Sequence, residues 1–229
     1  FDSYQLMGGG VLLLGLIYFS FQIYCDFSGY SDIAIGTAKL FGIELMSNFK
    51  FPYFSRDIGE FWRRWHISLS SWFRDYLYIP LGGSKHGVWI STRNIFIIFV
   101  VSGFWHGANW TFIVWGFIHA LLYIPLFLIG KNRQYTTNVV AQNTWFPSVK
   151  ELFQMGTTFF SVMVAWIFFR SDSIIDGYKY LSIMISTFSF PHHERGGIVF
   201  VLLIVIFDWI MRNNEKNPLN FSHKYYRYC

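Results

Sequence analysis

A histidine lies in one of the most apolar stretches of the chain. Residues 100–112 read VVSGFWHGANWTF, and His106 is the one titratable side chain among them. An imidazole in apolar surroundings costs free energy unless a hydrogen bond compensates it. Histidine also suits general-base chemistry, because its unperturbed pKa of about 6.5 lies near working pH. The residues alone leave two interpretations open: a structural histidine bonded to a carbonyl, or a residue that moves protons within a membrane.

The polar neighbours of His106 have helical spacing. Ser102 lies four residues before the histidine and Asn109 three residues after it, so that on one helix the three side chains share a face. We expect this face, together with the adjacent Trp105, to bind a polar substrate inside the membrane. Another histidine, His119, lies in the next apolar segment without comparable polar neighbours, and we expect it to be structural.

Glycines also flank the histidine. Gly103 and Gly107 lie on either side of His106, four residues apart. Small residues at this spacing let backbones approach closely. We therefore expect a neighbouring helix or a substrate chain to pack here.

A second histidine belongs to an amphipathic stretch. Residues 57–83 read DIGEFWRRWHISLSSWFRDYLYIPLGG, which is too polar to span a membrane. On a single helix of about 100° per residue, the aromatic and leucine side chains gather within one arc and His66 lies at its boundary. The arc contains Phe61, Trp62, Trp65, Leu69, Trp72, Phe73 and Tyr76. We predict one helix that lies at the membrane interface or re-enters the protein at membrane depth.

Charged side chains occupy the other side of this predicted helix. They are Arg63, Arg64, Arg74 and Asp75. Guanidinium groups bind phosphate in a bidentate manner, so the arginines are candidates to hold the phosphates of a cytosolic acyl donor. The alternative, which the pattern alone favours, is a surface helix whose arginines meet lipid phosphates.

Composition and hydropathy predict an all-α, polytopic membrane protein. Charged residues make up 14% of the 229 residues, against about 25% in soluble domains, and 22% are aromatic. Three segments are long enough to span a membrane, and two are short. We expect one of the short segments, residues 95–105, to be too short to cross alone. The three long segments are residues 8–25, 109–129 and 152–169, and the other short one is residues 198–211. We expect one membrane domain over residues 1–229, with a peripheral tail over 212–229.

The distribution of charge predicts an orientation. Basic residues gather between the first long segment and residue 95, in the loop after residue 129, and after residue 211, whereas the loop over 170–197 is balanced. The positive-inside rule then places the basic groups in the cytoplasm and the balanced loop outside. Membrane loops explain the net charge of +5 better than a nucleic-acid partner does. The two cysteines, Cys25 and Cys229, have no metal-ligand spacing, so no metal site is expected.

Acidic side chains follow the first and third long segments. Asp26 and Asp32 lie in YCDFSGYSDIAIG, where they could line an entrance or cap a following helix. We favour the capping interpretation, with Asp32 as the N-cap. For Arg170 and Asp172, in WIFFRSDS, we favour anchoring at the membrane interface.

Four blocks of this sequence resemble the membrane-bound O-acyltransferase (MBOAT) family. They are YCDFSGYSDIAIG, FWRRWHISLSSWFRDYLYIPLGG, SGFWHGANWTFIVWGFIHAL and WIFFRSDS, in the family's order. The detail is similar to the bacterial branch that includes the alginate O-acetyltransferase membrane subunit, and the blocks cover roughly two thirds of the chain. The family has more spans than this sequence predicts, so we expect N-terminal helices to be missing before Phe1.

The resemblance implies a polytopic helical fold with an intramembrane tunnel. The family's catalytic histidine corresponds to His106, and a second catalytic histidine of this branch to His66. The resemblance further implies transfer of an acyl group from a thioester, with acetyl-CoA as co-substrate and no bound cofactor, toward hydroxyls of an extracytoplasmic polysaccharide such as alginate. The expected location is the bacterial cytoplasmic (inner) membrane, with a periplasmic or membrane partner that completes the transfer.

A mechanism follows as an expectation. His106 accepts a proton while a hydroxyl attacks the thioester carbonyl, His66 orients the donor or relays the proton, and Asn109 donates to the oxyanion. An acyl-serine path through Ser102 is less favoured, because no nucleophile motif surrounds it. The alternatives are a D-alanyl transferase for teichoic acid and a non-enzymatic membrane transporter.

Overall fold

The computed structural model describes residues 3–136, 138–191 and 194–214, and these residues form helices and loops without a strand. The all-α prediction is therefore confirmed for the described residues. The α-helices are α1 (Gly9–Leu40), α2 (Ile58–Arg64), α3 (Ile67–Phe73), α4 (Val88–His106), α5 (Trp110–Leu128), α6 (Val149–Arg170), α7 (Ile174–Ser186) and α8 (Gly197–Met211). Short 3-10 helices η1 (Tyr4–Leu6) and η2 (Pro52–Phe54) and the π-helix η3 (Arg74–Tyr78) complete the order.

Side-chain caps explain where several helices begin. Asp57 caps α2, Asn109 caps α5 and Ser173 caps α7, each by accepting a backbone N–H of the first turn. Ser148 and Glu151 form a reciprocal capping box at the start of α6. These side chains satisfy N–H groups that have no partner within the helix.

Four helices, α1, α4, α5 and α6, are long and apolar enough to cross a membrane. The prediction that residues 95–105 are too short to cross was wrong, because α4 begins seven residues earlier, at Val88. Two polar side chains of this extension, Asn94 and Ser91, donate to nearby carbonyls, whereas the buried hydroxyl of Thr92 has no partner among the described residues. The amide of Asn94 donates to the carbonyls of Leu81 and Gly83, and the hydroxyl of Ser91 donates to the carbonyl of Gly87. Polar residues with such partners can be buried in a membrane helix at little cost.

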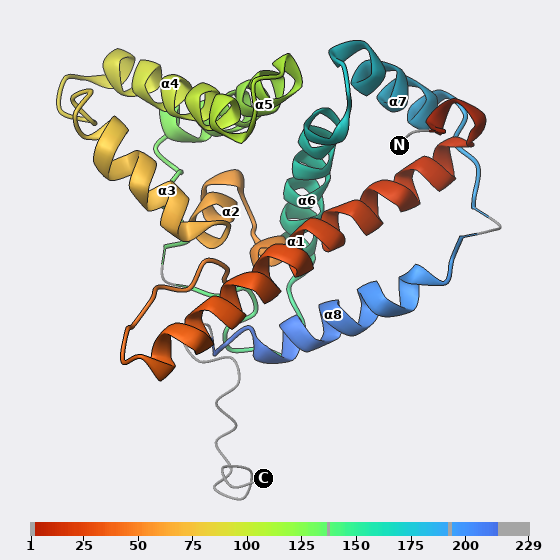
Figure 1. Ribbon diagram of the computed structural model, residues 1–229, viewed down its shortest axis with the longest axis horizontal. Helices are drawn as coiled ribbons and strands as arrows, with labels where there is room; N and C mark the ends of the chain where they lie inside the picture. The colour runs from red at the N-terminus through yellow and green to blue at the C-terminus, as the bar shows by residue number, and fades with distance from the viewer. Residues whose placement is uncertain (1–2, 137, 192–193, 215–229) are drawn as a thin grey trace, which may run out of the picture.

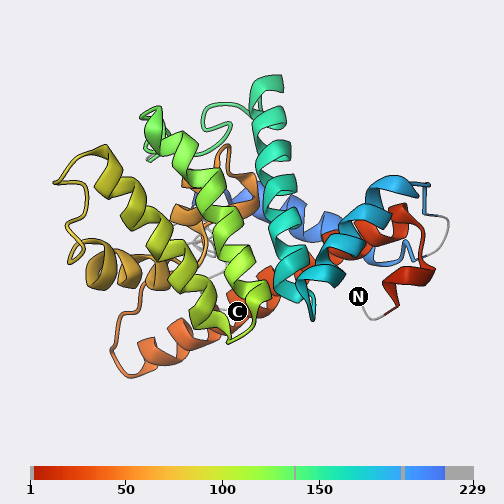
Figure 2. The ribbon, with the colours of Figure 1, turned by 90° about the horizontal axis from the view of Figure 1, so that it is seen from above.

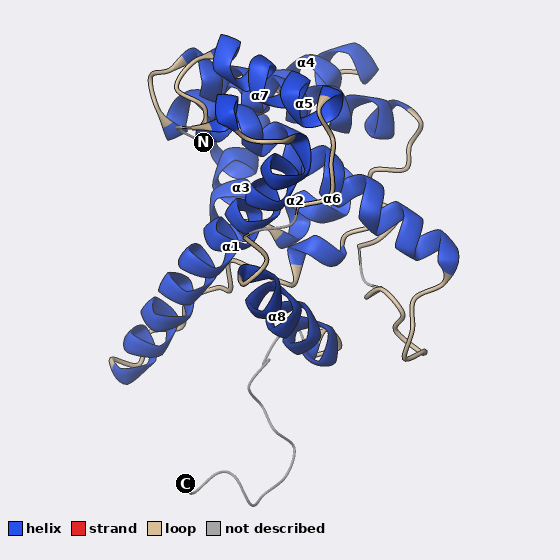
Figure 3. Ribbon diagram, turned by 90° about the vertical axis from the view of Figure 1, so that its right-hand side faces the viewer, coloured by secondary structure: helices blue, strands red, loops and turns tan. Residues whose placement is uncertain are grey.

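Helix α1 is longer than its apolar segment. It runs unbroken through residues 26–40, so Asp26 and Asp32 lie within the helix, and the prediction that Asp32 is an N-cap was wrong. Figure 3 shows the C-terminal part of α1 projecting away from the other helices. The N-terminal part packs against α7 and α8, where the hydroxyl of Tyr180 donates to the carbonyl of Leu12 at 2.7 Å. Figure 1 shows α8 beside α1 and the α4–α5 pair on the other side of α6.

Helices α4 and α5 form a closely packed antiparallel pair, seen side by side in Figure 2. A Cβ atom on Gly103 would lie 2.2 Å from the carbonyl oxygen of Phe112, and one on Gly116 would lie 2.2 Å from that of Phe99. The backbones touch at both points, so the expectation of a close helix approach at Gly103 is confirmed.

The predicted single helix over residues 57–83 is broken at His66. Trp65 is extended, and His66 has a left-handed backbone conformation with a φ of 45°. The break turns the chain between α2 and α3, so the angular positions of one continuous helix do not hold across it. Phe61 and Trp65 enter the core, whereas Trp72 and Tyr76 of the same predicted arc are 51% and 68% exposed.

The described chain ends beside the loop between α5 and α6. Arg212 is buried, and its guanidinium donates to the carbonyls of Val140, Ala141 and Thr144. The remainder of the expected peripheral tail, residues 215–229, lies outside the described residues.

Candidate active site

His106 is the last residue of α4 and is surrounded by aromatic rings. Its ring centroid lies 4.9 Å from Trp105, 5.1 Å from Trp115 on α5 and 5.2 Å from Phe169 at the end of α6. In the described part of the chain, no carbonyl hydrogen-bonds this imidazole. The structural interpretation of His106 therefore lacks the partner that it requires, and both ring nitrogens are available for chemistry.

His66 lies near His106, and both imidazoles lie beside the indole of Trp105. Its ring centroid is 6.3 Å from Trp105 and 4.5 Å from Phe27 of α1. Burial, with a smaller contribution from the charge of a protonated His106, lowers the pKa of His66 to about 4. His66 is therefore a neutral imidazole at physiological pH. The two predicted catalytic histidines are brought together, although 40 residues separate them.

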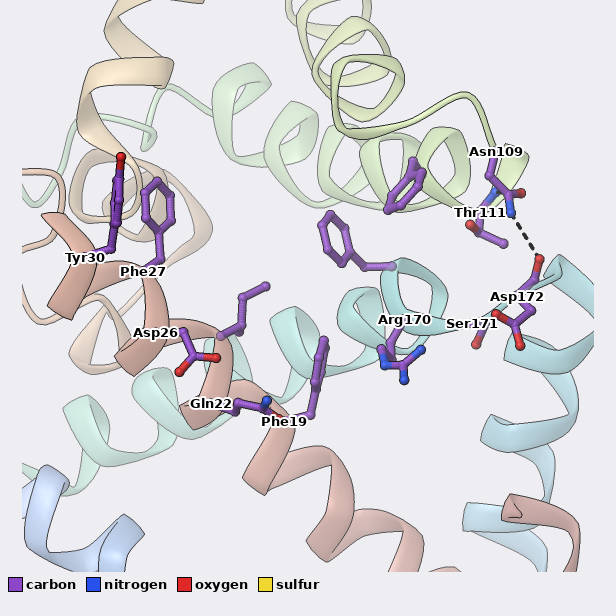
Figure 4. A pocket seen from close by; sticks show the side chains of 13 residues that line it. Phe19, Gln22, Asp26, Phe27, Tyr30, Asn109, Thr111, Arg170, Ser171 and Asp172 are labelled. Atoms are coloured by element: carbon purple, nitrogen blue, oxygen red, sulfur yellow. Dashed lines mark hydrogen bonds between the residues drawn. The ribbon is translucent and has the colours of Figure 1, made fainter. Parts of the chain in front are cut away.

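Two cavities of about 650 Å³ each flank these histidines. The first, here called the acidic cavity, contains Asp26, Arg170 and Asp172 among its lining residues. Figure 4 shows Asp26 on α1 facing the end of α6, where the amide of Asn109 donates to the backbone carbonyl of Asp172 at 3.1 Å. Phe27 and Phe169 complete the wall next to His66 and His106.

The second, here called the basic cavity, lies between α2–η3 and the α4–α5 pair. Its charged lining residues are Arg63, Arg74 and Arg133. Ser102, one turn before His106, and Ile67, directly after His66, also line it. Neighbours of both histidines thus line both cavities, although neither imidazole is itself among the lining residues.

The predicted phosphate-binding arginines differ in what they bind. The guanidinium of Arg64 is buried, binds Glu60 and the carbonyl of Lys50, and is not among the residues that line the basic cavity, so its role toward a donor phosphate stays a prediction. Arg63 lines the basic cavity, but its terminal nitrogens donate to the carbonyls of Asn132 and Tyr135.

Arg74 and Asp75 form an exposed ion pair. Their closest approach is 2.7 Å, from Nε to Oδ1, and only Arg74 lines the basic cavity. The Arg74 guanidinium holds the pKa of the Asp75 carboxyl below its usual value. Arg74 is accessible at the cavity wall, and we retain it as the arginine best placed for an anionic group.

Asn109 does not share a helix face with His106, and this prediction was wrong. Helix α4 ends at His106, and Asn109 caps α5 through its side-chain oxygen. Its amide nitrogen is bonded to Asp172, so Asn109 shapes the acidic cavity. Ser102 lines the basic cavity, and the indole of Trp105 lies beside both histidine rings.

The sequence interpretation missed the acidic cavity. Asp26 was assigned to capping and Arg170 and Asp172 to interface anchoring, whereas the three residues line one cavity. The available signal was Asp26 itself, since a carboxylate inside a long apolar helix is more often functional than structural. No group of three or more metal-ligand side chains occurs among the described residues.

The order of these elements matches a known protein family. The model of MBOAT, the membrane-bound O-acyltransferase family, matches residues 10–166. The chain belongs to this family. The matched region includes both histidines and every lining residue of the basic cavity, whereas Arg170 and Asp172 of the acidic cavity lie just after it.

Several curated MBOAT-like proteins are similar to this chain. The probable alginate O-acetylase AlgI of Pseudomonas syringae pv. tomato is 44% identical over 162 residues, which cover 70% of this chain and 29% of that protein. The peptidoglycan O-acetyltransferase of Helicobacter pylori is 41% identical over 73% of this chain and 30% of its own length. The teichoic acid D-alanyltransferase of Streptococcus thermophilus is 39% identical over 51% of this chain and 31% of its own length. The chain therefore spans less than a third of the length of these relatives.

Proposed function

We propose that this chain carries the catalytic histidines of a membrane O-acyltransferase that moves an acetyl group from a cytosolic thioester, acetyl-CoA, toward hydroxyls of an extracytoplasmic polysaccharide. The observation that carries the proposal is that neighbours of His106 and His66 line two cavities, one with three arginines and the other with two aspartates and one arginine. The basic cavity suits the phosphates of the donor, and the acidic cavity suits a hydroxyl-bearing acceptor. The names of the acetylating relatives support acetyl as the acyl group.

In this mechanism His106 acts as the general base. It takes the proton of the acceptor hydroxyl as the oxygen attacks the thioester carbonyl, and the carbon–sulfur bond breaks when the tetrahedral intermediate collapses. His106 then returns the proton to the leaving thiolate, which departs as free thiol. Neutral His66, which lies beside the indole of Trp105, polarises the thioester carbonyl or orients the donor.

The site needs no resident cofactor for this reaction. We place the protein in the bacterial cytoplasmic membrane, in contact with lipid, with the basic cavity toward the cytoplasm. Arg133 and Ser84, which line the basic cavity, belong to loops that the charge distribution assigns to the cytoplasm. A periplasmic or membrane partner protein that completes the transfer to the polysaccharide is part of the proposal.

Replacement of His106 tests the function. In cells that carry the full-length protein, His106→Ala should lower O-acetyl esters on surface glycans by at least about 100-fold, because a general base typically contributes 10²–10⁴-fold. Mass spectrometry of the glycans measures the ester, and detergent-extracted protein shows that the variant still inserts. His86→Ala, in the exposed loop before α4, is the matched control and should leave ester levels unchanged. Normal ester levels in the His106 variant would falsify the proposal.

The second candidate is a D-alanyl transferase acting on teichoic acid, which the Streptococcus relative supports. The same mass spectra separate the two, because alanyl and acetyl esters differ in mass. A non-enzymatic transporter predicts a different result: the His106 variant loses movement of substrate across the membrane, whereas an enzyme loses formation of the ester bond.

A further inference from the structure

His119 is the most deeply enclosed titratable residue near the site. It lies on α5, is 0% exposed and is surrounded by the rings of α2, α4 and α5. The centroids of Trp62 and Trp115 are each 4.9 Å from the imidazole, and those of Phe61 and Phe99 are 6.3 and 6.2 Å away.

Several polar nitrogens in this group have no protein partner. Among the described residues, neither ring nitrogen of His119 is hydrogen-bonded, nor is the indole nitrogen of Trp62 or of Trp115. A neutral imidazole offers one donor and one acceptor, whereas indoles can only donate. The two indoles therefore cannot satisfy each other, and buried polar atoms without partners are rare because they are costly.

A water molecule has the hydrogen-bond donors and acceptors that these nitrogens require. A water molecule accepts two hydrogen bonds and donates two, so it can accept from the indole N–H groups and donate to the unprotonated imidazole nitrogen. Buried waters in proteins typically make about three such bonds to otherwise unsatisfied groups.

The group also connects the basic cavity with His106. Trp62 lines that cavity, and Trp115 packs against the imidazole of His106 at 5.1 Å. Along α5, residues four apart continue the same face, from Thr111 at the acidic cavity to Tyr123 at the basic cavity, with Trp115 and His119 between them.

We propose that Trp62, Trp115 and His119 form an internal water-binding site, and that His119 is a positioning residue that acts through Trp115 on His106. The bound water ties the Trp115 indole to His119 and so fixes the ring against which the His106 imidazole is oriented. The positioning role rests on the proposed function, whereas the water site does not.

A kinetic comparison tests the positioning role. In membranes that carry the full-length protein, turnover of acetyl-CoA is measured for His119→Gln, which keeps a donor and an acceptor, and His119→Leu, which removes both. The leucine variant should lose about 10- to 100-fold in kcat, as expected for a misplaced catalytic group. Its KM for acetyl-CoA should stay within about 2-fold, since His119 does not contact the donor, and the glutamine variant should keep kcat within about 3-fold of wild type.

Val162→Ala, at another fully buried position in the core, controls for general loosening of the packing. Val162→Ala should lower the melting temperature without changing the pH dependence of kcat. His119→Leu, in contrast, should shift that pH dependence. The positioning role would be overturned if the loss of kcat in His119→Gln, His119→Leu and Val162→Ala simply followed the decrease in melting temperature of each variant.

A high-resolution structure of the full-length protein tests the water site itself. Ordered water should lie within about 3 Å of a His119 nitrogen and of at least one of the two indole nitrogens, and it should be absent in the leucine variant. Direct contact of the nitrogens with protein atoms in that structure would overturn the site. If wild-type membranes show no acetyl turnover, the proposed function fails, and the structural result still decides the water site.

Discussion

His66 combines a strained backbone with an enclosed side chain. Its φ of 45° lies in the left-handed region, which non-glycine residues occupy at a cost of order 1–3 kcal/mol. The surrounding rings of Phe27 and Trp105 hold the imidazole in this place. Such strain persists where the surrounding structure over-determines it, and here it turns the chain so that His66 faces the α4 terminus that carries His106.

The lowered pKa of His66 predicts a pH-dependent stability. Burial lowers the pKa to about 4 in the folded protein, against about 6.5 in the unfolded chain. Between these values the unfolded chain binds more protons, so stability should fall as the pH decreases from about 6.5 and should be fully reduced below about 4. Melting temperatures in detergent from pH 7 to 4.5 measure this dependence.

A side chain that cannot be protonated in this range removes the effect. His66→Gln should make this part of the pH profile less steep, whereas His86→Gln, in an exposed loop, should leave it unchanged. Parallel curves for wild type and His66→Gln would contradict the assignment of the effect to His66.

At the scale of elements, the α4–α5 pair decides where His106 lies relative to Trp115. The contacts at Gly103 and Gly116 are made by backbone atoms, which cannot rotate away as a side chain can. The two helices therefore approach as closely as their backbones permit, and His106 at the end of α4 reaches the ring of Trp115 on α5.

A side chain at Gly103 should separate the two helices. Gly103→Leu is expected to destabilise the protein by about 1–3 kcal/mol, the usual range for overpacking, and to abolish transfer together with the loss of the His106–Trp115 contact. Gly36→Ala, on the exposed side of α1 with open space around it, is the control and should be neutral or stabilising by up to about 1 kcal/mol. Thermal unfolding and acetyl turnover are measured on both. Wild-type stability in the leucine variant would show that the helices are not in contact there.

At the scale of the whole molecule, a buried ion network joins distant segments. Glu60 on α2 accepts from Arg56 and Arg64, each at 3.0 Å, and Arg56 also reaches Glu151 at the start of α6 at 3.5 Å. Arg64 further donates to the carbonyl of Lys50. The network attaches α2 to the start of the membrane-spanning helix α6.

Removal of the shared carboxylate should be costly. Glu60→Gln leaves two buried guanidinium groups without their common counter-ion, and we expect a loss of about 3–5 kcal/mol in the free energy of unfolding. Asp75→Asn breaks the exposed pair with Arg74 and should leave stability unchanged. Denaturation in detergent measures both variants, and equal stability of the two would contradict the structural role of the network.

The sequence by itself determined the helical class, most of the apolar segments and the two histidines, because hydropathy and residue type are local properties. Tertiary contacts decided the rest. The helical-wheel prediction over residues 57–83 assumed one continuous helix, whereas the left-handed backbone of His66 interrupts it. The apolar segment that begins at residue 95 is part of a longer helix, in which the side chain of Asn94 donates to carbonyls of the preceding loop. Asp26 and Asp172 became neighbours of one cavity only when α1 and α6 were packed together. A helical pattern states which residues can share a face, whereas the partner of each polar group depends on segments that are distant in the chain.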